Sequence, residues 1–178
     1  MGKTTNEAVT NRAKSPTTDL SVQRRGRIVN VVADFLRSNL RVPNVYIDPS
    51  GSGLSRVDVL AADAAGSGDV HAVSIEILKK PMVTMMLKVY VDAVKRLPAH
   101  YKYLAIPKGI TNVAHDPNLF FAADGIGRVG ILLISESGDH LPTVELAIKP
   151  ERFRMDAREL AQVERFLNSA KPDMYVRL

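Results

Sequence analysis

The chain has 178 residues, of which 24 are Lys or Arg and 19 are Asp or Glu, and its formal net charge is +5 at pH 7. This length predicts one domain with a short extension, and a hydrophobic content of 46% is typical of a globular protein. The chain has no cysteine, which excludes disulfides, thiolate metal ligands and cysteine nucleophiles and favours a reducing, cytoplasmic location. We expect no membrane span and no secretory signal, because no apolar stretch is long enough for the first and the N-terminus is too polar for the second.

The chain begins with a polar segment and continues as a basic helix. Residues 1–18 show no hydrophobic periodicity and are predicted to be a disordered tail. From Asp19 or Ser21 to Leu40, apolar residues recur at helical spacing, and the predicted buried stripe consists of Val22, Ile28, Val31, Val32, Phe35 and Leu36. This helix also carries an excess of arginine, namely Arg24, Arg25, Arg27, Arg37 and Arg41. Such a surface is often only solvated, but it also suits a nucleic acid partner.

Two acidic residues lie in apolar surroundings further along the chain. After a short strand near residues 45–47, residues 55–80 predict two antiparallel strands joined by a Gly/Ser/Asp turn. Asp58 falls in the first of these strands and Glu76 in the second, and pairing of the strand centres would set the carboxylates side by side. Carboxylates among branched aliphatic residues need a proton, a cation or a metal. We therefore expect a cation site here, unless both acids lie on a solvated face of the sheet.

The remaining elements predict an α/β fold with a mixed central sheet between helices. Residues 81–97 form an amphipathic helix, with a buried stripe predicted at Val83, Met86, Leu87, Tyr90, Val91, Val94 and Leu97. A buried strand at 101–107, a short helix near 117–124 and strands at 129–135 and 143–148 follow. A helix between two strands implies a crossover and hence a parallel pair. The core domain is expected at 19–150, and 151–178 should form a C-terminal helix and tail.

The C-terminal helix has a sequence signature at its start. Asp156 and Glu159 have the spacing of a capping box, in which each side chain bonds the main chain of the other residue. The predicted buried stripe of this helix consists of Leu160, Val163, Phe166 and Leu167.

Over about residues 19–150, this layout resembles the PD-(D/E)XK, or restriction-endonuclease-like, nuclease superfamily. Three stretches carry the resemblance: RVDVLAAD at 56–63, HAVSIEILKK at 71–80 and DGIGRVGILLISESGD at 124–139. The resemblance implies a restriction-endonuclease-like core in which Asp58 and Glu76 hold Mg²⁺ and Lys79 orients the attacking water. Hard oxygen ligands suit Mg²⁺, and the metal offsets charge that develops on a phosphodiester. Nucleic acid, in particular DNA, is the partner expected for Arg24, Arg25, Arg27 and Lys80.

The second motif departs from the acid-x-lysine pattern of that superfamily. If Glu76 takes the acid position, Leu78 stands at the lysine position; a shift of two residues places Ser74 and Glu76 there instead. Three hypotheses therefore stay open. The first is a nuclease-like domain with a degenerate site, which binds nucleic acid or a protein partner without cutting. The second is an active Mg²⁺-dependent nuclease, and the third is an unrelated α/β scaffold protein with solvated acids. Under the first two hypotheses, the basic helix should lie beside the acids. The sequence leaves the oligomeric state open.

Overall fold

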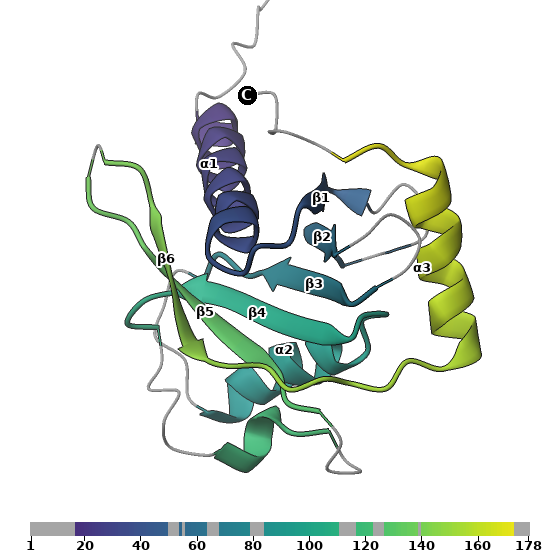
Figure 1. The fold of residues 1–178 in the computed structure, drawn as a ribbon. Helices are drawn as coiled ribbons and strands as arrows, with labels where there is room; N and C mark the ends of the chain where they lie inside the picture. The colour runs from purple at the N-terminus through teal and green to yellow at the C-terminus, as the bar shows by residue number, and fades with distance from the viewer. Residues whose placement is uncertain are drawn as a thin grey trace, which may run out of the picture.

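A computed structural model describes residues 17–49, 54, 56–63, 68–78, 84–110, 117–122, 127–138 and 140–172. Within these residues the elements are α1 (Thr17–Ser38), β1 (Asn44–Ile47), β2 (Val59–Ala62), β3 (Val70–Ile75), α2 (Thr84–Lys95), β4 (Tyr101–Pro107), the 3₁₀ helix η2 (Pro117–Phe120), β5 (Gly130–Ser135), β6 (Thr143–Ile148) and α3 (Ala157–Ser169). Figure 1 shows a single twisted sheet with helices around it. The predicted α/β fold with a mixed sheet and a C-terminal helix is confirmed.

The strands lie in the sheet in their order along the chain, β1-β2-β3-β4-β5-β6. The first three pair antiparallel, β3 to β4 and β4 to β5 are parallel, and β6 returns antiparallel to β5. Helix α2 makes the crossover between β3 and β4 that a parallel pair requires. As a result, β3, β4 and β5 end on the same side, and β2 begins there. We call this side the carboxyl end of the sheet.

The sheet separates two apolar layers. On one face, α1 packs through Ile28, Val32 and Leu36, which are fully or almost fully buried. On the other face, α2 and α3 pack through residues such as Val91 and Val163. The strands β3 and β4 are buried along almost their whole length, because a strand covered on both faces has no wet side.

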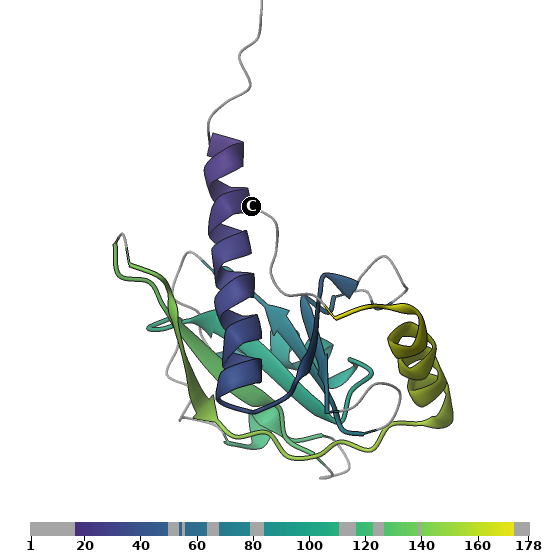
Figure 2. The ribbon, with the colours of Figure 1, turned by 45° about the horizontal axis from the view of Figure 1, so that its top comes forward.

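The structure corrects three residues of the predicted stripes and one boundary. Helix α1 begins at Thr17, so its first residues belong to the segment expected to be a tail, of which residues 1–16 lie outside the described residues. Val22 is 64% exposed because the first turns of α1 project beyond the sheet (Figure 2). Met86 and Leu160 are also exposed, so their helices bury narrower stripes than the periodicity suggested. The predicted capping box of α3 is confirmed, with both Asp156–Glu159 hydrogen bonds present.

None of the described helices combines the length and apolar character that crossing a membrane requires.

Candidate binding site at the carboxyl end of the sheet

Asp58 lies at the carboxyl end of the sheet, in the segment that leads into β2. Its main-chain N–H donates to the carbonyl of Val73, and its own carbonyl accepts from the N–H of Asp48, both at 2.9 Å. Asp48 and Arg56 have φ angles of 48° and 73°, in the left-handed region that residues other than glycine seldom occupy. The main chain of Asp58 is therefore bonded to the strands on both sides just before β2 begins. The alternation of apolar residues had predicted that Asp58 lies within this strand. In the structure, Asp58 comes immediately before the strand.

Both carboxylate oxygens of Asp58 have a donor. Oδ2 accepts a 2.6 Å hydrogen bond from the main-chain N–H of Ile75, the last residue of β3. Oδ1 forms an ion pair with the guanidinium of Arg25, which comes from α1. The Asp58 side chain is 20% exposed and that of Arg25 is 49% exposed. The cation that meets Asp58 in the structure is therefore an arginine, held against the end of β3.

The protonation of Asp58 is governed mainly by its burial. Burial raises the pKa of Asp58 above its ordinary value, while the hydrogen bond from Ile75 and the charge of Arg25 lower it. A smaller contribution from the charge of Asp48 acts with burial. Because an ion-paired carboxylate ordinarily has a lowered pKa, the net rise means that desolvation outweighs the pair. The guanidinium of Arg25 therefore offsets part of the desolvation free energy that burial of the Asp58 carboxylate costs.

Glu76 immediately follows β3, at the same end of the sheet. Its main-chain N–H donates to the carbonyl of Ala105 at 2.9 Å, which extends the pairing of β3 with β4 by one residue. Burial raises the pKa of Glu76, and the charge of Asp58 raises it further. The charges of Arg25 and Arg56 oppose this rise. The two carboxyl groups are therefore close enough to influence each other's titration, as expected for a shared site.

The register of β2 and β3 separates the two acids along the strands. Val59 pairs with Val73, so the position opposite Asp58 belongs to Ser74, and Glu76 lies two residues further on. Pairing of the strand centres was expected to set the two carboxylates side by side; in the observed register they are offset by two residues along the strands. Pairing of the apolar residues fixes this register, because a slip would move buried side chains to other positions.

Two cavities meet at the Arg25–Asp58 pair. One, of about 330 Å³, opens toward α2 and is lined by Arg25, Arg56, Asp58, Ser74, Ile75, Glu76, Val89, Tyr90, Ala93, Val94 and Leu97. The other, of about 320 Å³, opens toward α1 and is lined by Val22, Arg25, Gly26, Val29, Ile47, Asp48 and Asp58. Both are in the size range of ligand pockets, with apolar walls and a few convergent charged groups. The first holds both predicted acids and is the stronger candidate for a binding site.

The site does not present an open set of metal ligands. Among the residues that the structure describes, no group of three or more His, Asp or Glu side chains could hold a metal ion. Mg²⁺ requires oxygen ligands in near-octahedral geometry. One oxygen of Asp58 accepts from the N–H of Ile75 and the other is paired with Arg25. Of the two predicted metal ligands, Glu76 is therefore the one whose carboxylate could still bind a metal ion. The residues therefore fit an arginine better than a magnesium ion.

The basic residues predicted to contact nucleic acid fall into three situations. Arg24 and Arg25 are neighbours on α1, yet Arg24 pairs with Glu136 at 2.8 Å and Arg25 pairs with Asp58. Arg27 is exposed and makes no ion pair with the described part of the chain. Lys79 and Lys80 lie outside the described residues. The predicted juxtaposition of the basic helix with the acidic pair is thus present, through Arg25.

Sequence patterns did not identify Arg56, Asp48 or Glu136 as site residues. Asp48 and Arg56 lie next to turns, where polar residues are common for structural reasons and therefore do not indicate a functional site. Glu136 contacts Arg24 across 112 residues of sequence. No local pattern could have shown this contact.

Comparisons with known proteins give little information on function. No protein-family model matches the chain, and no curated protein matches it. Among solved structures, a protein of unknown function from Silicibacter pomeroyi superposes with a TM-score of 0.43 and 14% sequence identity. The superposition covers 79% of this chain and 81% of that protein.

Proposed function

We propose that this chain is a nuclease-like domain with a degenerate site, which binds DNA without cutting it. The observation that carries the proposal is the state of Asp58. One of its oxygens accepts from Ile75 and the other is paired with Arg25, at the position where a cutting site would need a metal ligand. A guanidinium compensates the carboxylate charge but cannot activate water as a Lewis acid does.

The distribution of positive charge supports DNA as the partner. Arg25 and Arg56 line the cavity beside the acids, and Arg27 is exposed on the same helix as Arg25. The whole chain has an excess of five positive charges. Basic groups gathered around a cleft are the usual basis of phosphate binding, and they make the affinity strongly dependent on salt.

An active Mg²⁺-dependent nuclease is the second candidate, favoured by one observation. Asp58 and Glu76 line the same cavity, and the charge of Asp58 raises the pKa of Glu76. Such a pair would bind a divalent ion if Arg25 moved away from Asp58. The ion would then offset charge on the phosphodiester, as in other metal-assisted hydrolysis.

Two measurements on the purified chain test the proposal. Fluorescence anisotropy with a labelled DNA duplex in EDTA, repeated over a series of salt concentrations, should show binding with a linear fall of log K against log salt. Incubation of plasmid with Mg²⁺ or Mn²⁺ should leave it intact. Cleavage that disappears in Asp58→Asn would establish the second candidate instead. Absence of both binding and cleavage would contradict both candidates and favour the scaffold hypothesis or a protein partner.

A further inference from the structure

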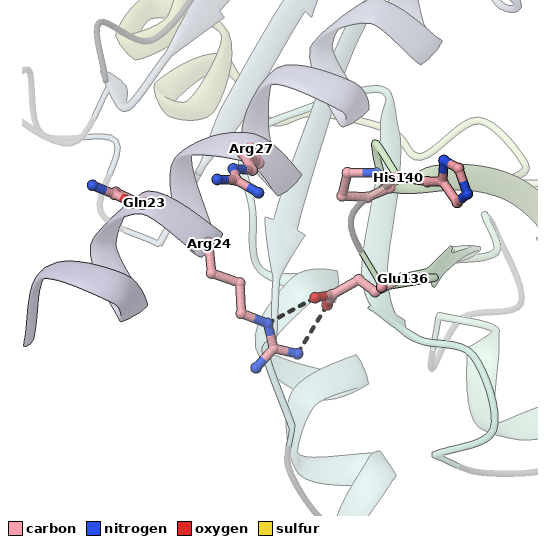
Figure 3. A pocket seen from close by; sticks show the side chains of 7 residues that line it. Gln23, Arg24, Arg27, Glu136 and His140 are labelled. Carbon is pink, nitrogen blue, oxygen red and sulfur yellow. Dashed lines mark hydrogen bonds and ion pairs between the residues drawn. The ribbon is translucent and has the colours of Figure 1, made fainter. Parts of the chain in front are cut away.

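A small charged pocket, distinct from the two cavities at Asp58, lies between α1 and the β5–β6 hairpin. It encloses about 130 Å³, and its polar lining consists of Gln23, Arg24, Arg27, Glu136 and His140 (Figure 3). Gln23 and Arg27 are one helical turn apart, so they and Arg24 extend from neighbouring positions on α1. The volume suits one small ion rather than a nucleoside.

The Arg24–Glu136 pair occupies one side of this pocket. Nε and Nη2 of Arg24 each donate to a different carboxylate oxygen of Glu136, both at 2.8 Å, as Figure 3 shows. These bonds use two of the five N–H donors of the guanidinium, and they raise the pKa of Arg24. The two side chains are 43% and 31% exposed. Because both side chains are accessible to water, the carboxylate can leave the guanidinium and another anion can take its place.

Among the residues that the structure describes, the pocket lining has more positive than negative charge. Arg27 lines it and has no ion-pair partner among the described residues, while Glu136 is the acidic residue in the lining. His140, like Glu136, comes from the connection between β5 and β6, and its main-chain N–H donates to the carbonyl of Ser137 at 3.0 Å. The lining holds two guanidinium groups and one carboxylate, which leaves donors for an oxyanion. Bidentate arginine contacts with phosphate have the same geometry as those with carboxylate.

We propose that this pocket binds one phosphate group of a nucleic acid strand, and that Glu136 occupies the position of that phosphate on Arg24 when no strand is bound. The phosphate displaces the Glu136 carboxylate from the guanidinium of Arg24 and accepts further hydrogen bonds from Arg27. The phosphate site itself follows from the pocket, whereas a strand as the source of the phosphate rests on the proposed function. Glu136 is thus an internal competitor, and its removal should strengthen binding.

Titration with inorganic phosphate, followed by NMR of backbone amides, tests the pocket directly. Glu136→Gln should bind phosphate up to about fivefold more tightly, because the competing charge of an exposed pair is lost. Arg27→Ala should bind about tenfold more weakly, since a charge-assisted contact is removed. Arg158→Ala is the matched control: it removes the same charge from an exposed position on α3 and should leave phosphate affinity unchanged.

The parent chain and these three variants are then titrated with a labelled DNA oligonucleotide. Glu136→Gln should tighten and Arg27→Ala weaken the binding, and Arg27→Ala should reduce the slope of log K against log salt by about one. Weaker phosphate binding in Glu136→Gln, or no phosphate response in any protein, would overturn the pocket assignment even if DNA still bound. A phosphate response with no DNA binding would overturn the strand as the source, and with it the proposed function, and would assign the pocket to free phosphate.

Discussion

Two adjacent residues of α1 make arginine–carboxylate pairs in very different surroundings. Arg25 meets Asp58, which is 20% exposed and also accepts from the main chain of Ile75. Arg24 pairs with Glu136, whose side chain is 31% exposed and has no hydrogen bond to any described residue other than Arg24. Both pairs join a guanidinium to a carboxylate, with two hydrogen bonds between Arg24 and Glu136 and one between Arg25 and Asp58. The surroundings of the two carboxylates also differ. The Asp58 carboxylate is bonded to the last residue of β3, while Glu136 follows β5 in the β5–β6 hairpin.

This difference decides what each pair can do. Asp58 cannot leave without removing the acceptor of the Ile75 N–H, so its carboxylate is a fixed part of the site. If the Glu136 side chain moves away from Arg24, water can solvate both charged groups, so opening this pair costs little free energy. A fixed carboxylate keeps its need for a cation, whereas a carboxylate that can move away suits a ligand site.

The largest effect should come from removing the Asp58 carboxylate. Asp58→Ala leaves the N–H of Ile75 without its acceptor, and we expect a loss of about 1–3 kcal/mol in the free energy of unfolding. Asp58→Asn keeps an acceptor and should lose less. Glu136→Ala should stay within about 0.5 kcal/mol of the parent chain. Urea denaturation of the three variants measures the comparison, and equal losses at Asp58 and Glu136 would contradict it.

A smaller effect should follow from removal of the cation that pairs with Asp58. Arg25→Ala frees Oδ1 of Asp58, and we expect a loss of about 1 kcal/mol at pH 7 together with a gain in Mn²⁺ or Mg²⁺ affinity. Calorimetric titration with the metal measures the second quantity. Arg25→Lys retains the positive charge and serves as the control. If metal affinity is the same in all three chains, Arg25 does not stand in for a metal ion.

The smallest effect should be the pH dependence that Glu76 adds. Burial raises its pKa in the folded chain above its ordinary value of 4.5. The unfolded chain is then the stronger acid at this position, so the contribution of Glu76 to stability is fully present below pH 4.5 and is lost as pH rises through the folded pKa. The difference in unfolding free energy between the parent chain and Glu76→Gln should therefore shift against the parent as pH rises from about 4 to 7. A difference that does not vary with pH would show that Glu76 is not desolvated.

Much of the fold could be predicted because its signals are local. The amphipathic period of α2, the capping box at Asp156 and the apolar run of β5 each lie within a few residues, and each appears in the structure. The stripe positions at Val22, Met86 and Leu160 were wrong. Periodicity shows which residues share a helix face, but it does not show how far the neighbouring layer extends.

For the candidate site, the sequence by itself determined which residues carry the charge and that Asp58 and Glu76 fall at successive strands of one hairpin. Tertiary structure alone decided the register that places Ser74 opposite Asp58. It also decided that Arg25 pairs with Asp58 and that Arg24 pairs with Glu136. The physical reason is that these contacts join segments 33 and 112 residues apart. Burial of two apolar layers sets the geometry of such contacts, and the polar residues then take the partners which that geometry brings within reach.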